Sequence, residues 1–437
     1  MQQRLSIVRI LIIFLVSEIY FSMYNHHWFI GLFSPFFAIS SSINIVFVIL
    51  LFYIYAIYQL NPQGKISWIK SSCNVKLFFP VLFYFILGVC VIVIHEEGFD
   101  AIKRYLIYLF TPVIVGLSIW GLYRKNNFIE ITLKILFMLG VIFSLYSVAL
   151  HIILWNGDAD DIINIAAKYG SQDYDIDYSE RFTIPGMPPN MLQSIVVPLI
   201  LTGFYFNRNS SGNLRYMYVG AILFLFYSVI ITASRGALIS LMAGMSYLIC
   251  KGWFRFNKGT IFFILVSFFV TFIGGNLLYS RIEWIVENYS RVLREGNIYF
   301  AEHRLIASLD SLGYFLENPL LGMGFTNFFS SQENLLGFSD HNLYSILLAQ
   351  GGVLVFIPFV FILALQYLNS RKILSKNMFS DPAARDMGIV LNAGLIAYII
   401  DLNFPPGFFH YYWIWFGFAA AWTRNCEMEY RTQEKLL

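Results

Sequence analysis

Arg235 stands near the middle of an almost wholly apolar stretch, FYSVIITASRGALISLMAGMSYLI (residues 226–249). A guanidinium group stays charged at any physiological pH and binds phosphate oxygens through two parallel hydrogen bonds. A charged side chain in or beside a membrane is a functional candidate when it faces the interior of a helix bundle. Arg235 is therefore a candidate for binding an anionic group. The alternative is that its side chain only reaches lipid headgroups.

Composition indicates what surrounds this arginine. Of the 437 residues, 58% are hydrophobic and 19% aromatic, while only 13% are charged. A soluble domain carries about 25% charged residues. We therefore expect an all-α integral membrane protein that forms a single polytopic domain over residues 1–437. The net charge of +3 is too small to indicate a nucleic-acid partner.

Apolar runs predict the helices. A hydrocarbon core about 30 Å thick needs about 20 helical residues, which predicts about twelve transmembrane helices. The runs lie near residues 5–24, 29–58, 77–94, 105–122, 128–154, 189–206, 216–233, 237–250, 260–279, 342–366, 388–401 and 411–423.

Charge predicts the orientation. With a cytoplasmic N-terminus, most of the 29 basic residues fall on the inner side and most of the 26 acidic residues on the outer side. This is the bias of membrane proteins, so both termini are expected in the cytoplasm. Arg235 then lies at an outward turn between two spans. Seven of the nine outer basic residues are arginines, and all seven histidines lie at or near the outer side. The outer basic residues are Lys103, Arg104, Lys168, Arg181, Arg235, Arg281, Arg291, Arg294 and Arg304.

Two outer loops are longer than turns. Residues 155–188 form an acidic loop, and residues 280–341 form the largest loop, just before the third-last span. A loop this long is uncommon unless it is functional. Within it, apolar residues at helical spacing predict a helix that Asn318-Pro319 ends, lying against the membrane or against the top of the bundle. These apolar residues are Leu305, Ile306, Leu309, Leu312 and Leu316.

Four stretches on the outer side, taken in order, resemble the O-antigen polymerase and O-antigen ligase superfamily. They are ERFTIPGMPPNML (180–192), TASRGALISL (232–241), HRLIASLDSLGYFLENPLLGMGFTNF (303–328) and DHNLYSILLAQGGVLVFI (340–357). The span count and the late outer loop also agree with this family. The resemblance implies a GT-C-like membrane glycosyltransferase of the bacterial inner membrane, with its active site on the periplasmic side.

The resemblance also implies the reaction. A glycan moves from an undecaprenyl-pyrophosphate carrier to a hydroxyl group of a second glycan, without a metal or another cofactor. It implies that Arg235 and Arg304 bind the pyrophosphate and that His341 is the base. Fixed positive groups stabilise the charge that grows on the leaving pyrophosphate, and a neutral imidazole suits proton removal near neutral pH. Attack from the opposite face would invert the anomeric centre.

Other residues are candidates for contacts with the substrate. Arg181 and Asn190 match a less certain element of the family pattern. Asp340 is placed to orient the ring of His341, and Asn342 to bind a sugar hydroxyl. His303 is an alternative candidate for the base. Arg291 and Arg294 either extend the phosphate site or belong to the plain surface of a helix.

Four functions remain open: a polymerase, a ligase, a protein-glycosylating or exopolysaccharide relative, and a transporter or flippase. In ligases of this family, the glycine that matches Gly352 is followed three positions later by a small or polar residue. This chain has Val355 at that position, which favours a polymerase over a ligase that delivers the glycan to lipid A-core. A chain-length regulator is a possible partner of a polymerase. A transporter or flippase would need ionisable groups at mid-bilayer and paired repeats; Glu18 is the clearest such group, and no repeat is evident.

Overall fold

The computed structural model describes residues 2–21, 49–54, 72–105, 111–155, 189–231, 235–253, 299–325, 342–375, 381–403 and 410–434. These residues form helices and turns, with no strand among them, which agrees with the predicted all-α class. The helices are α1 (Gln2–Phe21), α4 (Ser72–Ile94), α5 (Phe99–Arg104), α6 (Thr111–Leu122), α7 (Asn126–Trp155), α9 (Pro189–Asn209), α10 (Asn213–Ile231), α11 (Arg235–Cys250), α14 (Tyr299–Glu317), α16 (Leu343–Ser375), α17 (Pro382–Asp401) and α18 (His410–Glu434).

Ten of the apolar runs coincide with helices, because a long apolar segment in a membrane must satisfy its backbone hydrogen bonds within itself. In the run predicted over 105–122, the described helix is α6 from Thr111, the short α5 lies before the run, and residues 106–110 lie outside the described part of the chain. The runs near 29–58 and 260–279 lie mostly outside the described residues. α14 ends at Glu317, directly before Asn318-Pro319, as predicted.

Within the described residues, three helical segments are long and apolar enough to cross a membrane: Asn126–Leu145 of α7, all of α16 and all of α17. Four shorter apolar helical segments accompany them, in α4, α6, α10 and α11. Large apolar side chains such as Phe83 and Ile357 face outward from these helices. Long apolar helices with apolar side chains on their outer surface are typical of a helical membrane protein.

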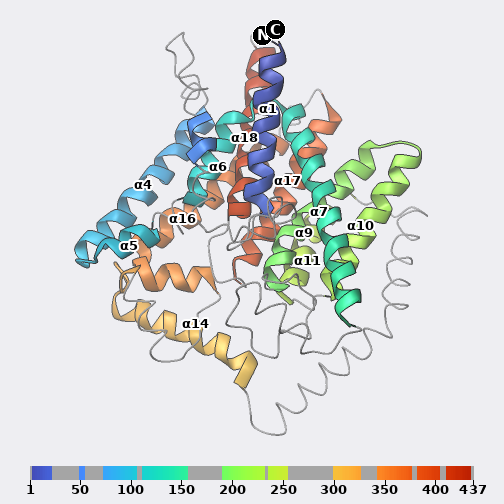
Figure 1. Cartoon of the computed structure of the whole chain (residues 1–437). Coiled ribbons are helices and arrows are strands. Elements are labelled where there is room, and N and C mark those ends of the chain that lie inside the picture. The colour runs from blue at the N-terminus through green and yellow to red at the C-terminus, as the bar shows by residue number, and fades with distance from the viewer. Residues whose placement is uncertain are drawn as a thin grey trace.

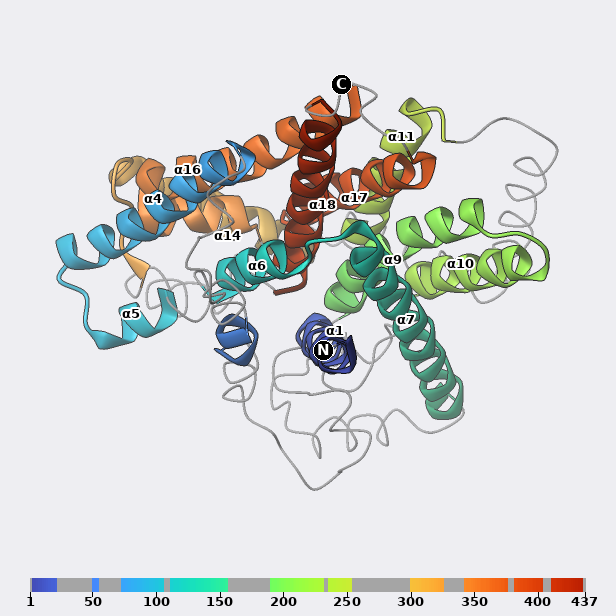
Figure 2. The same ribbon diagram turned by 90° about the horizontal axis from the view of Figure 1, so that it is seen from above.

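Both chain ends lie at one end of the bundle, which we call the terminus end (Figure 1). At the other end, which we call the opposite end, α14 lies across the bundle. Viewed along the bundle from the terminus end, α1 and α18 are near the middle, α4, α14 and α16 lie on one flank, and α10 lies on the other (Figure 2).

The packing of α17 against α18 forms the centre of the core. The indole nitrogens of Trp415 and Trp422 donate hydrogen bonds to the carbonyl oxygens of Leu391 (3.0 Å) and Ala384 (2.8 Å). Two glycines of α17 make room for these rings: a Cβ atom at Gly388 would lie 2.0 Å from Trp422. Small residues at a helix contact are typical of membrane bundles, because they let the backbones approach closely.

α16 is broken at Gly352, which has a φ of 58° and a ψ of −160°. The segment after α14 fills the break: Met323 N donates to Ala349 O (2.7 Å), Gly324 N to Gln350 O (3.0 Å), and Val353 N to Pro319 O (3.0 Å). A Cβ atom at Gly352 would lie 2.4 Å from Leu320 O, so only glycine fits there. The break therefore joins two of the family-like stretches, 303–328 and 340–357, through their backbones.

α14 packs on the first part of α16 with small side chains and one tyrosine. Ala307 and Ser311 are buried, and Tyr314 packs against Ile346 and Ala349. The leucines at helical spacing in α14 do not form this contact. Leu309, Leu312 and Leu316 are exposed.

Candidate functional site

A buried carboxylate marks the opposite end of the bundle. Asp401, the last residue of α17, is only 3% exposed. Its Oδ2 accepts a hydrogen bond from Tyr412 Oη (2.8 Å), and its Oδ1 accepts one from Ser240 Oγ (3.3 Å). The Ser194 hydroxyl also hydrogen-bonds to it. We call these four residues the Asp401 cluster.

The members of the cluster come from four helices that approach one another only in the folded chain. Ser194 lies on α9, Ser240 on α11, and Tyr412 on α18, each within the first two turns of its helix. The N-terminus of α16 reaches the same place, because Leu343 N donates to Leu402 O (3.0 Å). The N-terminal ends of four helices therefore gather around the C-terminal end of α17.

This arrangement explains how a carboxylate can be buried there. Burial of a charge is costly unless hydrogen bonds or opposite charges compensate it. Among the described side chains, the donors to Asp401 are neutral hydroxyls. The N-terminal end of each helix adds a partial positive charge and free backbone N–H groups. The hydroxyls and the helix ends thus offset part of the cost of burying this carboxylate.

Tyrosines surround the cluster and connect it with α1. Tyr20 Oη donates to Ile195 O (3.0 Å) and shares a hydrogen bond with Tyr398 Oη (3.2 Å). The ring of Tyr398 contacts those of Tyr411 and Tyr412, at centroid distances of 5.9 and 4.6 Å. These contacts connect α1, α9, α17 and α18 at the cluster.

The predicted phosphate ligand Arg235 is the first residue of α11, directly after the junction with α10. Residues 232–234 lie outside the described part of the chain, and the structure describes the backbone of Arg235 but not its side chain. Ser240, five residues further on, belongs to the Asp401 cluster. Since a helix rises about 1.5 Å per residue, the backbone of Arg235 starts about 7.5 Å further along the helix axis than that of Ser240.

The structure describes the other predicted site residues to different extents. His303 and Arg304 lie in the second turn of α14, and Asn190 is the second residue of α9; the structure describes their backbone and not their side chains. Arg181, Arg291, Arg294, Asp340 and His341 lie outside the described residues, as do residues 156–188 of the acidic loop.

Asn342 is the predicted substrate contact whose side chain is described. It is half-buried directly before α16, and its Oδ1 accepts a hydrogen bond from Tyr344 N (3.0 Å). Tyr344 Oη in turn donates to Ile399 O (2.7 Å). Asn342 therefore caps α16, while Leu343 and Tyr344 hold the start of this helix against the end of α17.

Sequence reasoning missed the Asp401 cluster. A signal was present: Asp401 is the one acidic residue in the apolar run LNAGLIAYIIDLNF, and an ionisable residue in such a run is a functional candidate. Among the described side chains, no group of three potential metal ligands gathers.

No protein-family model and no curated protein matches this chain.

Proposed function

We propose that the chain is a membrane glycosyltransferase that polymerises a surface polysaccharide. It transfers a glycan from an undecaprenyl-pyrophosphate carrier to a sugar hydroxyl group of a second lipid-linked repeat. The opposite end of the bundle faces the periplasm of a bacterial inner membrane, both chain ends face the cytoplasm, and the architecture is of the GT-C type.

One observation carries this proposal: the N-terminal ends of α9, α11 and α16 meet at residues 401–402. These three helices begin in the family-like stretches that contain Asn190, Arg235 and His341. The fourth stretch, with Arg304, begins in α14 and is bonded to the break of α16. Stretches spread over more than 160 residues of sequence are thus brought to one end of the bundle, which supports a common site.

The proposed chemistry follows from these residue types. The acceptor hydroxyl oxygen attacks the anomeric carbon while the bond from that carbon to the pyrophosphate oxygen breaks, and the electron pair of this bond stays on the pyrophosphate. Arg235 and Arg304 stabilise that growing negative charge, as fixed donors do in other group transfers. His341 receives the proton of the hydroxyl group.

The Asp401 cluster has a positioning role in this scheme. Its hydrogen bonds tie α9, α11 and α18 to α17, so the helix ends that carry Asn190 and Arg235 are fixed relative to α16. A catalytic group misplaced by 1 Å can slow a reaction by about 10²-fold. The cluster therefore affects the rate without a contact to the sugar.

Two experiments test the proposal. Detergent-purified protein should elongate a defined lipid-linked repeat, with elimination of undecaprenyl pyrophosphate, and the linkage of the product should show inversion. Deletion of the gene should leave surface polysaccharide with single-repeat ends on a gel. Bare lipid A-core would instead indicate a ligase, and unchanged glycans together with an inactive purified protein would refute the assignment as a glycosyltransferase.

A further inference from the structure

The position of the break in α16 indicates how deep in a membrane the end of α14 lies. Residues 353–370 of α16 contain no charged side chain, and Arg371 follows them. These 18 residues rise about 27 Å as a helix, close to the thickness of about 30 Å of a hydrocarbon core. Counted back from Arg371, this length reaches Gly352, and we place the boundary of the hydrocarbon at the opposite end near this residue. Val353 N and Leu354 N bond to Pro319 O and Leu320 O (3.0 and 3.4 Å), so the end of α14 lies at this boundary.

α14 has three faces when its residues are placed at about 100° per residue. Ala307, Ser311 and Tyr314 face α16. Leu309, Leu312 and Leu316 share a second face, about 60° wide, and are 56%, 38% and 73% exposed. The third face carries the acidic residues Asp310 and Glu317, about 80–100° from Leu309. A helix with separate protein, apolar and acidic faces is suited to a position between protein, lipid and water.

The apolar face leads toward α16, which is long and apolar enough to cross a membrane. Leu320 is exposed beside Leu354 of α16, and Ile357 is exposed one turn further along that helix. The turn before α5 adjoins the same place: a Cβ atom at Gly324 would lie 2.5 Å from Glu97 Oε1. Phe99 of α5 is also exposed there. Leu320, at the end of this apolar face, thus adjoins Leu354 of α16.

We propose that Leu309, Leu312, Leu316 and Leu320, the leucine face, lie among the acyl chains of the lipid leaflet at the opposite end. α14 is then an interfacial helix, with its acidic face in water and its third face on α16. This inference needs only that α16 spans the membrane, and it is independent of the proposed reaction. Under the proposed function it has one consequence: the leucine face sets the height of residues 303 and 304 above the bilayer, near the headgroup of a lipid-linked substrate.

The test measures depth directly. All four native cysteines are replaced, and the variants Leu316→Cys, Glu317→Cys and Phe361→Cys are each labelled with an environment-sensitive fluorophore. The full-length protein is placed in phosphatidylethanolamine and phosphatidylglycerol vesicles that contain nitroxide-labelled lipids. For Leu316→Cys we expect blue-shifted emission and stronger quenching by a nitroxide near the headgroup than by one deep in the acyl chain. Phe361→Cys, in mid-span, should show the reverse order.

Glu317→Cys is the matched control, because it is the adjacent residue on the acidic face. It should keep water-like emission and react with a membrane-impermeant maleimide. Equal, water-like behaviour of Leu316→Cys and Glu317→Cys would overturn the proposal. A second result would also overturn it: a label at Leu316→Cys that neither nitroxide lipid quenches, at a cysteine that does not react with the maleimide. Protein, and not lipid, would then cover the leucine face. If Leu316→Cys does not fold, Leu312→Cys provides the same readout.

Discussion

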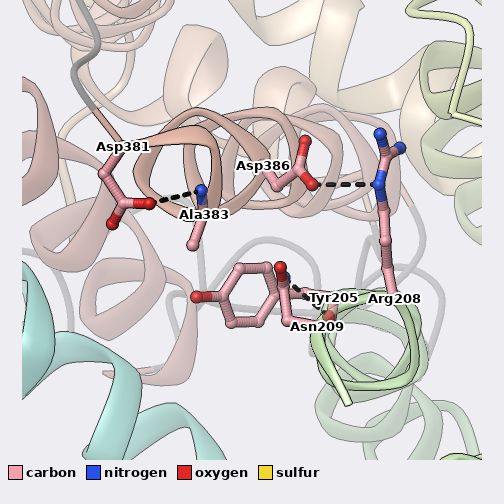
Figure 3. Close-up of polar contacts among 6 residues, drawn as sticks. All are labelled: Tyr205, Arg208, Asn209, Asp381, Ala383 and Asp386. Atoms are coloured by element: carbon pink, nitrogen blue, oxygen red, sulfur yellow. Dashed lines mark hydrogen bonds and ion pairs between the residues drawn. The ribbon is translucent and has the colours of Figure 1, made fainter. Parts of the chain in front are cut away.

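A carboxylate of α17 joins this helix to α9 and α11 near each of its ends. The two junctions differ in exposure and in the groups that the carboxylate contacts. Near the terminus end, Asp386 forms an ion pair with Arg208 (Nε to Oδ2, 3.0 Å), whose side chain is 44% exposed (Figure 3). The guanidinium group of Arg208 also lies 4.6 Å from the ring of Trp253, which follows α11. At the opposite end, Asp401 is buried and bonded to neutral hydroxyls.

From this difference in exposure and bonding we infer a different role for each junction. The Asp386 side chain is only 13% exposed, but solvent reaches the ion pair from the Arg208 side, so we expect the pair to add about 1 kcal/mol or less. The helix cap that Asp381 forms on Ala383 N (2.9 Å) adds a local contact beside it (Figure 3). A buried carboxylate is costly to keep, and an apolar contact would join the helices at lower cost. We therefore expect substitutions near the terminus end to change stability, and those at the opposite end to change glycan transfer.

The largest effect is expected for His341→Ala at the opposite end. Loss of the base should lower the rate of transfer by about 10²- to 10⁴-fold, with binding of the carrier lipid and the thermal unfolding midpoint unchanged. The measurements are the initial rate with purified protein and a lipid-binding titration. Asn403→Ala, an exposed residue at the same end, is the control. A parallel loss of binding would make His341 a substrate contact and not the base.

Arg304→Lys should have the next largest effect, a decrease in transfer of about 10²-fold. The charge remains, but an ammonium group cannot form the paired hydrogen bonds of a guanidinium group. Arg431→Lys, at the terminus end, where Arg431 pairs with Glu427 (2.6 Å), is the control and should transfer at the normal rate. Chain lengths of the polysaccharide on a gel provide the readout in cells. Normal lengths in Arg304→Lys would argue against the pyrophosphate role.

Asp401→Asn and Asp386→Asn form a matched pair on the same helix. In Asp401→Asn an amide NH₂ group replaces an oxygen that now accepts from Ser240 or Tyr412, so the cluster loses a hydrogen bond. We expect transfer per folded molecule to fall about tenfold, equivalent to about 1.4 kcal/mol. Asp386→Asn should keep full transfer and lower the unfolding midpoint slightly. Equal transfer rates in the two variants would remove the distinction between the junctions.

The smallest effects should come from Ser240→Ala and Arg208→Ala. Ser240 Oγ lies closer to Gly236 O (2.8 Å) than to Asp401 Oδ1 (3.3 Å), so its single proton is shared between two acceptors. Its loss should lower transfer less than Asp401→Asn does, and it should also cost about 0.5–1.5 kcal/mol of stability. Arg208→Ala should cost about 1 kcal/mol or less and leave transfer intact. Unfolding midpoints in detergent check both values, and a strong loss of transfer in Arg208→Ala would contradict the assignment of this junction to stability.

Part of the site was accessible from the sequence, because its signals are local. The position of Arg235 follows from the lengths of the apolar runs on either side of it. The end of α14 follows from Asn318-Pro319, since proline cannot continue a helix. The exposure of Leu309, Leu312 and Leu316 was not accessible: helical spacing identifies an apolar face, but it does not say whether protein or lipid covers that face.

The sequence by itself determined that this chain is a bundle of apolar helices, and it determined where most of them begin and end, because apolar length and helix-stopping residues act within a few turns. Only the tertiary structure decided that the segment after α14 fills the break at Gly352 and that Asp401 meets hydroxyls of three other helices. Ser240 is 161 residues from Asp401 in sequence. Such partners are chosen by packing, hydrogen-bond geometry and the cost of burying a charge, and these quantities exist only once the helices are in contact.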